Sequence, residues 1–207
     1  MMKIAQIKSV HSSIGLVMLF MIVMVSGCDQ NTADDSQVNQ ENHTEIKNDH
    51  PAQKPKPPRV DMHTAVISGD INAVQQHILS GSDIDQKDPF GGSSPLISAA
   101  LFNQPEIAVL LLDAGADIDF KNNDGSTALH VAAFFCRPEI VKLLLSKGAD
   151  KSLQNNMGST AYDTVAGPFE SVKAIYDMLG QSLAPMGLSL DYDYLRATRP
   201  QVAALLK

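Results

Sequence analysis

The feature that most restricts the fold of this chain is a 33-residue internal repeat. Residues 94–100 (Ser-Pro-Leu-Ile-Ser-Ala-Ala) align with residues 127–133 (Thr-Ala-Leu-His-Val-Ala-Ala) at a shift of 33 positions. Residues 105–117 align with residues 138–150 at the same shift, so the register holds across two successive segments. A repeat of this length predicts an array of small supersecondary units, each of which buries its apolar face against its neighbours.

Each copy of the repeat carries the signals of two short helices. Asp124 and Gly125 supply a turn, Thr127 can cap a first helix, and a pair of alanines allows two helices to approach closely. A triplet of leucines then fills the stack. Gly115 and Gly148 end the second helices, where a residue with left-handed backbone is needed. The sequence therefore predicts helix-turn-helix units joined by longer loops.

These residues resemble the ankyrin repeat, whose pattern runs Asp-Gly-x-Thr-Pro-Leu-His-x-Ala-Ala and then Glu-Ile-Val-x-Leu-Leu-Leu-x-x-Gly-Ala-Asp. The copy that begins at Asp124 matches almost throughout; it departs mainly at Ala128, which replaces Pro, and at Cys136, which replaces Gly. The resemblance implies an all-α ankyrin-repeat solenoid of helix-turn-helix units with β-hairpin-like loops. We expect about four repeats followed by a truncated C-terminal cap.

The repeat domain is expected at residues 61–207. Its repeats are expected at about 61–88, 89–122, 123–155 and 156–180. The first copy is divergent and polar, as suits the end of a stack, and Gly167-Pro168 interrupts the fourth. Because residues 199–206 echo residues 137–144, we interpret 181–207 as a truncated fifth repeat that acts as a cap.

Residues 1–27 predict a signal peptide. Two lysines and no acidic residue precede an apolar run of 12 residues, Ile14–Val25. This run covers roughly 18 Å as a helix, short of the ~30 Å hydrocarbon core of a bilayer. Val25-Ser26-Gly27-Cys28 follows, and it resembles the lipobox of bacterial lipoproteins. The resemblance implies that Cys28 is lipidated and anchors the mature chain to a membrane.

Residues 28–60 predict a flexible tether, since they are polar and rich in proline and bury too little apolar surface to fold. Asp29 directly after the cysteine resembles the signal that retains lipoproteins in the inner membrane. We therefore expect a protein of the bacterial cell envelope that faces the periplasm, with the inner membrane slightly favoured over the outer.

The composition argues against nucleic acid as a partner. The chain has 16 Lys and Arg against 23 Asp and Glu, a net charge of −7, and loss of the two leader lysines takes it to −9. It has no Trp and 5% aromatic residues, so it offers neither a basic surface nor a stacking platform.

The motifs of common catalytic, phosphate-binding and metal-binding sites are missing from the sequence, and no catalytic residue, metal or cofactor is expected. His130 occupies the ankyrin position whose histidine bonds backbone between repeats. The Asp83/Asp85 and Asp117/Asp119 pairs fall where the loops begin, so we interpret them as turn residues. With Cys28 lipidated, Cys136 stands alone, either as a reactive thiol or, as we favour, as a small residue at a tight turn.

Ankyrin stacks bind proteins through loop tips and the concave row of first helices, so the resemblance implies a protein partner. Whether Leu101, Phe102, Phe134 and Phe135 contact a partner or pack internally stays open. The candidate partner-binding residues are Phe90, Phe120, Lys121, Asn122, Asn123, Ser152, Leu153, Gln154 and Asn155 on the loops, with Ser98, Leu101, Val131 and Phe134 on the first helices.

The function expected from these features is that of a membrane-tethered periplasmic protein-binding module, an adaptor or an inhibitor. The alternative is an immunity-type lipoprotein that neutralises a toxin delivered to the periplasm. An enzyme and a passive envelope spacer are the less favoured hypotheses.

Overall fold

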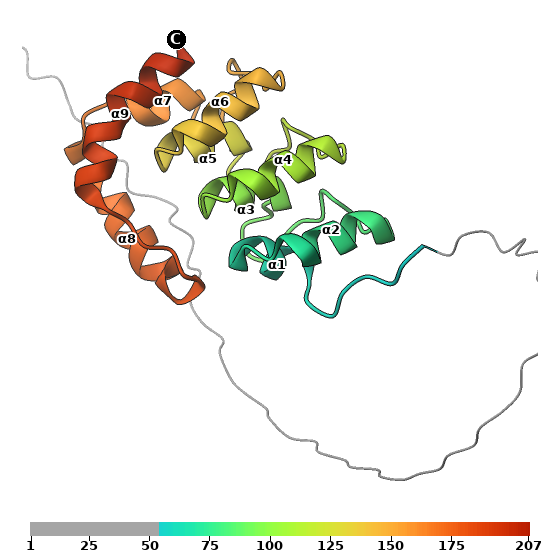
Figure 1. Cartoon of the computed structure of the whole chain (residues 1–207). Coiled ribbons are helices and arrows are strands. Elements are labelled where there is room, and N and C mark those ends of the chain that lie inside the picture. The colour runs from blue at the N-terminus through green and yellow to red at the C-terminus, as the bar shows by residue number, and fades with distance from the viewer. Residues whose placement is uncertain (1–53) are drawn as a thin grey trace, which may run out of the picture. The chain divides into compact units, whose positions relative to one another are not determined.

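The computed structural model describes residues 54–207; the expected leader, Cys28 and most of the expected tether lie outside the described residues. Over 54–207 the chain is helical and contains no strand. None of the helices in this range has both the length and the apolar character to cross a bilayer. The helices are arranged as a stack of pairs, with one further helix beside it (Figure 1).

The first three units share one plan, two helices joined by a tight turn. In chain order the helices are α1 (Met62–Ser68) with α2 (Ile71–Ser80), α3 (Pro95–Leu101) with α4 (Pro105–Asp113), and α5 (Ala128–Phe134) with α6 (Pro138–Ser146). The first helices α1, α3 and α5 pack on one another along the stack, followed by α7 (Ala161–Ala166). The second helices α2, α4 and α6 form a second row.

Local chemistry explains where these helices begin. Asp61, Ser94 and Thr160 each accept a hydrogen bond from the backbone N–H three residues further on, which satisfies a donor that the helix leaves free. Pro105 and Pro138 begin second helices, where a backbone N–H is not needed.

The turn between the helices of a unit passes through the left-handed region of backbone space. Gly69, Asn103 and Cys136 have φ angles of 73°, 56° and 53° there. This explains why the ankyrin pattern has glycine at this turn, and Cys136 adopts the same backbone in place of that glycine.

The core runs the length of the stack, between the two rows of helices. Leu96, Ile107, Leu111, Leu129 and Leu144 are among its fully buried side chains. Burial of each such side chain stabilises the fold by about 1.5–3 kcal/mol relative to leaving it in water.

The fourth unit departs from the expected boundaries. After α7 come a 3₁₀ turn, η1 (Phe169–Ser171), the helix α8 (Lys173–Leu183) and a second 3₁₀ turn, η2 (Ala184–Met186); the last helix is α9 (Tyr192–Leu206). It is α9 that packs against α7 and α6, whereas α8 stands beside the stack (orange in Figure 1).

In place of a repeat at 156–180 and a separate cap at 181–207, α7 and α9 therefore form one unit with residues 167–191 inserted between them. The echo of residues 137–144 in residues 199–206 has a structural meaning, because Val202 and Leu206 are buried as Ile140 and Leu144 are. What differs from the expectation is the unit to which this helix belongs, because α9 pairs with α7 in the fourth unit and does not form a separate cap.

A buried arginine binds the insertion, residues 167–191, to the stack. Arg199 of α9 is 3% exposed, and its guanidinium donates to the carbonyls of Thr164 and Gly167 and, at 3.0 Å, to the hydroxyl of Tyr176 on α8. The Tyr176 hydroxyl in turn donates to the carbonyl of Phe134 at the end of α5. The Tyr176 ring stacks on Phe134 with ring centroids 4.5 Å apart. Arg199 thus joins α9 to α7 and α8, and Tyr176 joins α8 to α5.

Replacement of this arginine should open the fourth unit. We expect Arg199→Ala to lower the free energy of unfolding by about 3 kcal/mol, because buried carbonyls and a hydroxyl lose a charged donor. The matched control is Arg196→Ala on the same helix, whose exposed ion pairs with Glu170 and Asp193 and whose contact with the Phe169 ring, 4.6 Å away, should together contribute about 1 kcal/mol. Urea unfolding of the full chain in mild detergent, followed by circular dichroism, measures both; equal losses would contradict this account of Arg199.

Candidate functional site: the finger edge

Three loops connect the units and lie along one edge of the stack. We call them fingers and count each from its glycine with positive φ: residues 81–94 lie between α2 and α3, 115–127 between α4 and α5, and 148–160 between α6 and α7. The surface they form together is the finger edge.

One side chain in each finger holds the tip in the same way. The Asp88 carboxylate accepts hydrogen bonds from the backbone N–H groups of Phe90, Gly91 and Ser93. The Oδ1 atoms of Asn122 and Asn155 accept from the N–H groups two and four residues further on. These three positions are therefore equivalent, and the side chain two residues after each one stands at the tip.

Neighbouring fingers are joined by backbone hydrogen bonds. The N–H of Asn123 donates to the carbonyl of Gly91 at 3.0 Å, and the N–H of Asn156 donates to the carbonyl of Asp124 at 2.9 Å. The Asn156 side-chain amide adds a bond to the carbonyl of Asn123. The finger edge is thus one continuous surface in which each tip fixes the next.

The paired carboxylates at the base of the fingers serve the backbone. Asp85 accepts from the N–H of Asp117, and Asp119 accepts from the N–H of Asp150, each at 3.1 Å. Burial raises the pKa of Asp85, although the bond from Asp117 opposes that shift. The carboxylates link successive units, which agrees with their interpretation as turn residues.

His130 also connects two units. It is buried, its Nδ1 lies 2.9 Å from the Thr127 hydroxyl, and its Nε2 lies 3.1 Å from the carbonyl of Ser159 in the next unit. Burial lowers the pKa of this imidazole, which keeps the ring neutral at neutral pH. These contacts match the structural role expected from the resemblance.

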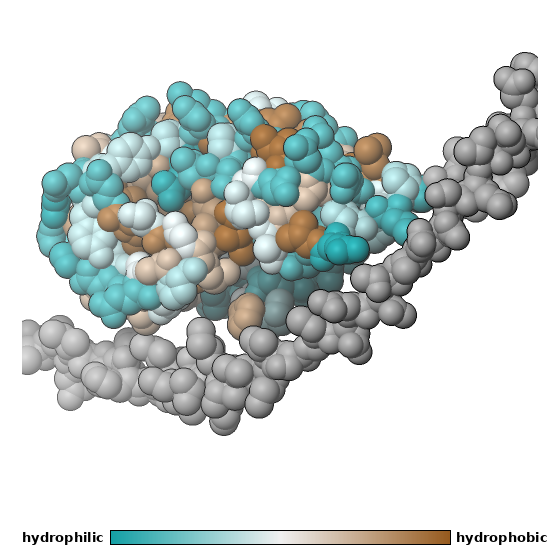
Figure 2. All heavy atoms as spheres, turned by 60° about the horizontal axis from the view of Figure 1, so that its bottom comes forward, coloured by the Kyte–Doolittle hydropathy of each residue, from teal (hydrophilic) through white to brown (hydrophobic). Residues whose placement is uncertain are grey.

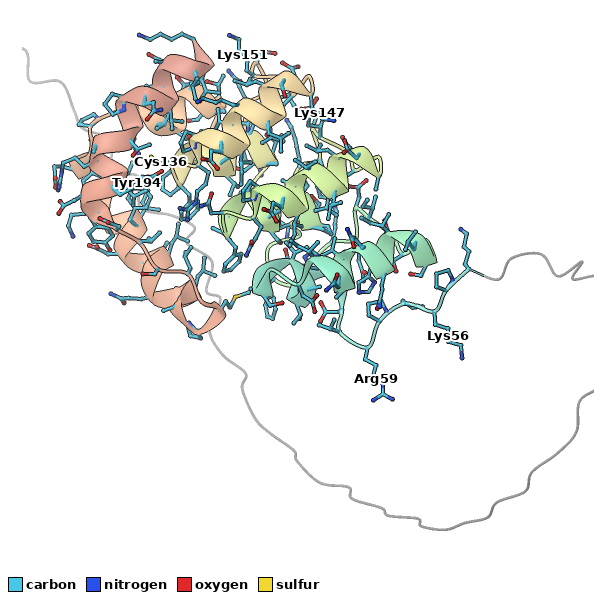
Figure 3. All side chains as sticks on the ribbon, in the orientation of Figure 1. Lys56, Arg59, Cys136, Lys147, Lys151 and Tyr194 are labelled. Carbon is cyan, nitrogen blue, oxygen red and sulfur yellow. The ribbon has the colours of Figure 1, made fainter. Side chains whose placement is uncertain are left out.

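The Cys136 thiol is buried and is not in a reactive environment. It lies where the α5–α6 turn meets α9, close to Tyr194, whose hydroxyl lies 3.4 Å from the carbonyl of Cys136 (Figure 3). Burial raises the pKa of the thiol to about 11, although Arg199 and Arg137 act in the opposite direction. The thiol is therefore protonated at neutral pH, and the structure supports the small-residue interpretation.

The structure sorts the candidate binding residues by exposure. Those exposed on the finger edge are Phe90, Lys121, Asn123, Ser152 and Gln154. Those partly buried are Phe120, Asn122, Leu153, Leu101, Val131 and Phe134. Phe120 packs against the core with the Lys87 ammonium 5.5 Å from its ring centre, which leaves it less available than expected.

Three candidates face inward, for identifiable reasons. Ser98 is 7% exposed and lies beside the His63 imidazole, and Asn155 is buried because its amide holds the third finger. Phe134 is covered by Tyr176 of the insertion. Ser98 and Asn155 are therefore less accessible to a partner than expected, and Phe134 is partly covered. Phe135, whose role the sequence left open, is buried beside the same tyrosine.

Two exposed tip residues, Asp124 and Met157, are absent from the candidates expected from the sequence. Met157 is 82% exposed at the tip position equivalent to Phe90, which is 83% exposed. The first finger has one residue more than the third between its capping side chain and the glycine with positive φ, Gly92 or Gly158. This extra residue hides the equivalence, because Phe90 and Met157 are not separated by a multiple of 33 positions.

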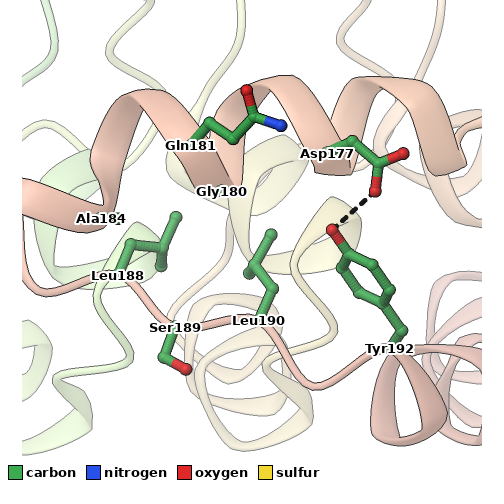
Figure 4. Close-up of a pocket in the computed structure, with 8 residues that line it drawn as sticks. All are labelled: Asp177, Gly180, Gln181, Ala184, Leu188, Ser189, Leu190 and Tyr192. Atoms are coloured by element: carbon green, nitrogen blue, oxygen red, sulfur yellow. Dashed lines mark hydrogen bonds between the residues drawn. The ribbon is translucent and has the colours of Figure 1, made fainter.

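Surfaces away from the fingers have fewer of the features typical of a binding site. On the face drawn in Figure 2, apolar atoms form separate patches among hydrophilic ones. A shallow pocket of about 360 Å³ lies between α8 and residues 188–192, where the Tyr192 hydroxyl donates to Asp177 (Figure 4). Asp177 also pairs with Lys173, so its carboxylate is already engaged. Residues 54–207 contain no group of three His, Cys, Asp or Glu side chains placed to hold a metal ion.

The close contact between fingers can be tested with two glycines of equal backbone conformation. Gly125 and Gly158 have φ angles of 72° and 74°, but a Cβ at Gly125 would lie 2.9 Å from the backbone nitrogen of Asn156, whereas one at Gly158 would meet nothing within 4 Å. We expect Gly158→Ala to cost about 1–2 kcal/mol from its backbone alone. Gly125→Ala should cost at least about 1 kcal/mol more, as measured by urea unfolding. Equal costs would show that the fingers do not depend on this contact.

Comparison with known proteins agrees with this geometry. The family model for ankyrin repeats matches residues 62–155 in three copies. Protein phosphatase 1 regulatory subunit 27 of Homo sapiens and that of Mus musculus are each 41% identical over 64 residues, which is 31% of this chain and 41% of each relative. The chain thus spans less than half the length of these relatives. The crystal structure of the ankyrin repeat domain of Bcl-3 has a TM-score of 0.48 and 36% identity, covering 50% of this chain and 45% of that one. Residues 62–155 are therefore ankyrin repeats, and the all-α ankyrin-repeat fold expected from the sequence is confirmed.

Proposed function

We propose that this protein is a non-enzymatic binding module that holds a protein partner on its finger edge. The observation that carries the proposal is the near-complete exposure of Phe90 and Met157 at equivalent finger tips. A large apolar side chain that protrudes from an ordered surface can serve as an anchor when a partner buries it.

The tips are free to bind because other atoms hold the fingers. The side chains of Asp88 and Asn155 and the backbone bonds between fingers fix the loops, and none of these bonds uses the side chain of Phe90 or Met157. A partner can therefore bury both side chains without disturbing the stack. The name of the curated relatives, a regulatory subunit of a phosphatase, also supports a role in binding another protein.

The proposed setting is the bacterial cell envelope. A lipid anchor at Cys28 would hold the module at a membrane, facing the periplasm, and residues 29–60 would tether it. The end of this segment, residues 54–59, carries no helix and is largely exposed, which agrees with a tether. A flexible coil of about 30 residues has a root-mean-square reach of roughly 30 Å, so the finger edge can meet a partner near the membrane. Neutralisation of a toxin that reaches the periplasm is a sharper form of the same proposal.

The binding surface can be tested by crosslinking in intact cells, followed by a pull-down with the full chain. We expect one protein to be recovered with the wild type and to fall at least about tenfold with the double variant Phe90→Asp, Met157→Asp. Met178→Asp is the control, because Met178 is also exposed but lies on α8, outside the fingers. Recovery of the same proteins by the double variant would contradict the proposal, and so would loss with Met178→Asp alone.

The anchor can be tested separately, because the chain has two cysteines, Cys28 and Cys136. We expect label from a radioactive fatty acid to remain on Cys136→Ser and to be lost from Cys28→Ser, which should also move from the membrane pellet to the soluble fraction. Persistence of the label on Cys28→Ser would contradict the anchor.

A further inference from the structure

We infer that the partner segment that docks on the finger edge is positively charged and presents two large apolar side chains, one to Phe90 and one to Met157. The inference rests on the proposed function, since it adds the chemistry of the partner to the binding surface proposed there.

The first argument is the distribution of charge. The fingers contain seven acidic side chains and three lysines. The acidic residues are Asp83, Asp85, Asp88, Asp117, Asp119, Asp124 and Asp150. Elsewhere between residues 54 and 207, acidic and basic side chains number ten each. With the fingers counted from their glycines, the net negative charge of the described residues lies in the finger edge; Lys147, directly before Gly148, pairs with Asp113 of α4.

This charge is not neutralised within the described part of the chain. None of the ion pairs among residues 54–207 involves a carboxylate of a finger. Apart from Asp124, the finger carboxylates accept hydrogen bonds from backbone N–H groups, and these bonds leave the net charge in place. A cationic partner would supply the missing counter-charge.

The three lysines of the fingers contact an aromatic ring or main-chain oxygen atoms of this chain. Lys87 lies over the Phe120 ring. Lys121 donates to the carbonyl of Gln154 at 3.0 Å, and Lys151 donates to the carbonyl of Lys207 at 2.7 Å. They hold neighbouring parts of this chain together and are not paired with the finger carboxylates.

The second argument is the order of the tip residues. Phe90, Asp124 and Met157 occupy equivalent positions in successive fingers, so the tips present an apolar, an acidic and an apolar side chain in turn. Packed helices lie 8–10 Å apart. Phe90 and Met157 stand on the first and third fingers, two such spacings apart, so they are separated by about 20 Å. An extended chain covers that distance in about six residues, and residues six apart point to the same face. The fitting segment has two large apolar residues about six positions apart and Lys or Arg between them, opposite Asp124.

A library of random peptides displayed on phage tests this chemistry directly. The full chain would be immobilised in mild detergent at about 50 mM salt, where exposed charges are weakly screened. We expect the selected peptides to be enriched in Lys and Arg, to carry two large apolar residues about six positions apart, and to be released when the salt is raised to about 0.3 M.

Charge reversal provides the matched variants. The selected peptides should bind at least about tenfold more weakly to Asp124→Lys, which reverses the charge at the central tip. Glu139→Lys makes the same change at an exposed position on α6, outside the fingers, and should alter binding by less than about twofold.

The outcomes separate this inference from the proposed function. Neutral or acidic peptides that bind the wild type and fail to bind Phe90→Asp, Met157→Asp would keep the finger edge as the binding surface and overturn the inference about charge. Unchanged binding to Asp124→Lys would overturn it too. A selection that yields nothing above the double variant would also overturn it, whereas the proposed function is decided independently by the pull-down from cells.

Discussion

The whole domain depends on each unit being covered by its neighbours. Helices of 7 to 10 residues, such as α1, α2, α3 and α5, are too short to be stable alone in water. Their apolar side chains become buried only when α3 lies between α1 and α5, and α4 between α2 and α6. Stability is therefore a property of the interfaces between units, and the finger edge is rigid because it follows those interfaces.

Hydrogen bonds extend the same dependence to the surface. Asp85 and Asp119 accept backbone N–H groups of the following unit, and His130 reaches the carbonyl of Ser159. Residues that look chemically active in the sequence thus hold one unit to the next. The side chains left free by this arrangement are those at the tips, which is why the candidate site lies at Phe90, Asp124 and Met157 and not at the histidine or the thiol.

The sequence was sufficient for the first three units and insufficient for the fourth. The turns, caps and leucines of an ankyrin unit are local signals, so a 33-residue shift predicts them one after another. The pairing of α7 with α9 is not local, because residues 167–191 separate them and the contacts of Arg199 with Thr164 and Gly167 are not visible in the sequence. Ser98 and Phe134 are less exposed than expected for a related reason: His63 and Tyr176, which lie against them, come from other units. Phe90 was recognised as a tip residue, whereas Met157 was hidden by the extra residue in the first finger.

The insertion also changes how the stack closes. The helices α5 and α6 are joined by three residues, whereas α7 and α9 are separated by 25. Bringing the ends of the longer connection together costs about 2 kcal/mol more in chain entropy, and the interactions of Arg199 and Tyr176 offset that cost. Loss of these interactions should therefore open the fourth unit before the first three, and hydrogen exchange in α9 would report that opening separately from the unfolding of the rest of the stack.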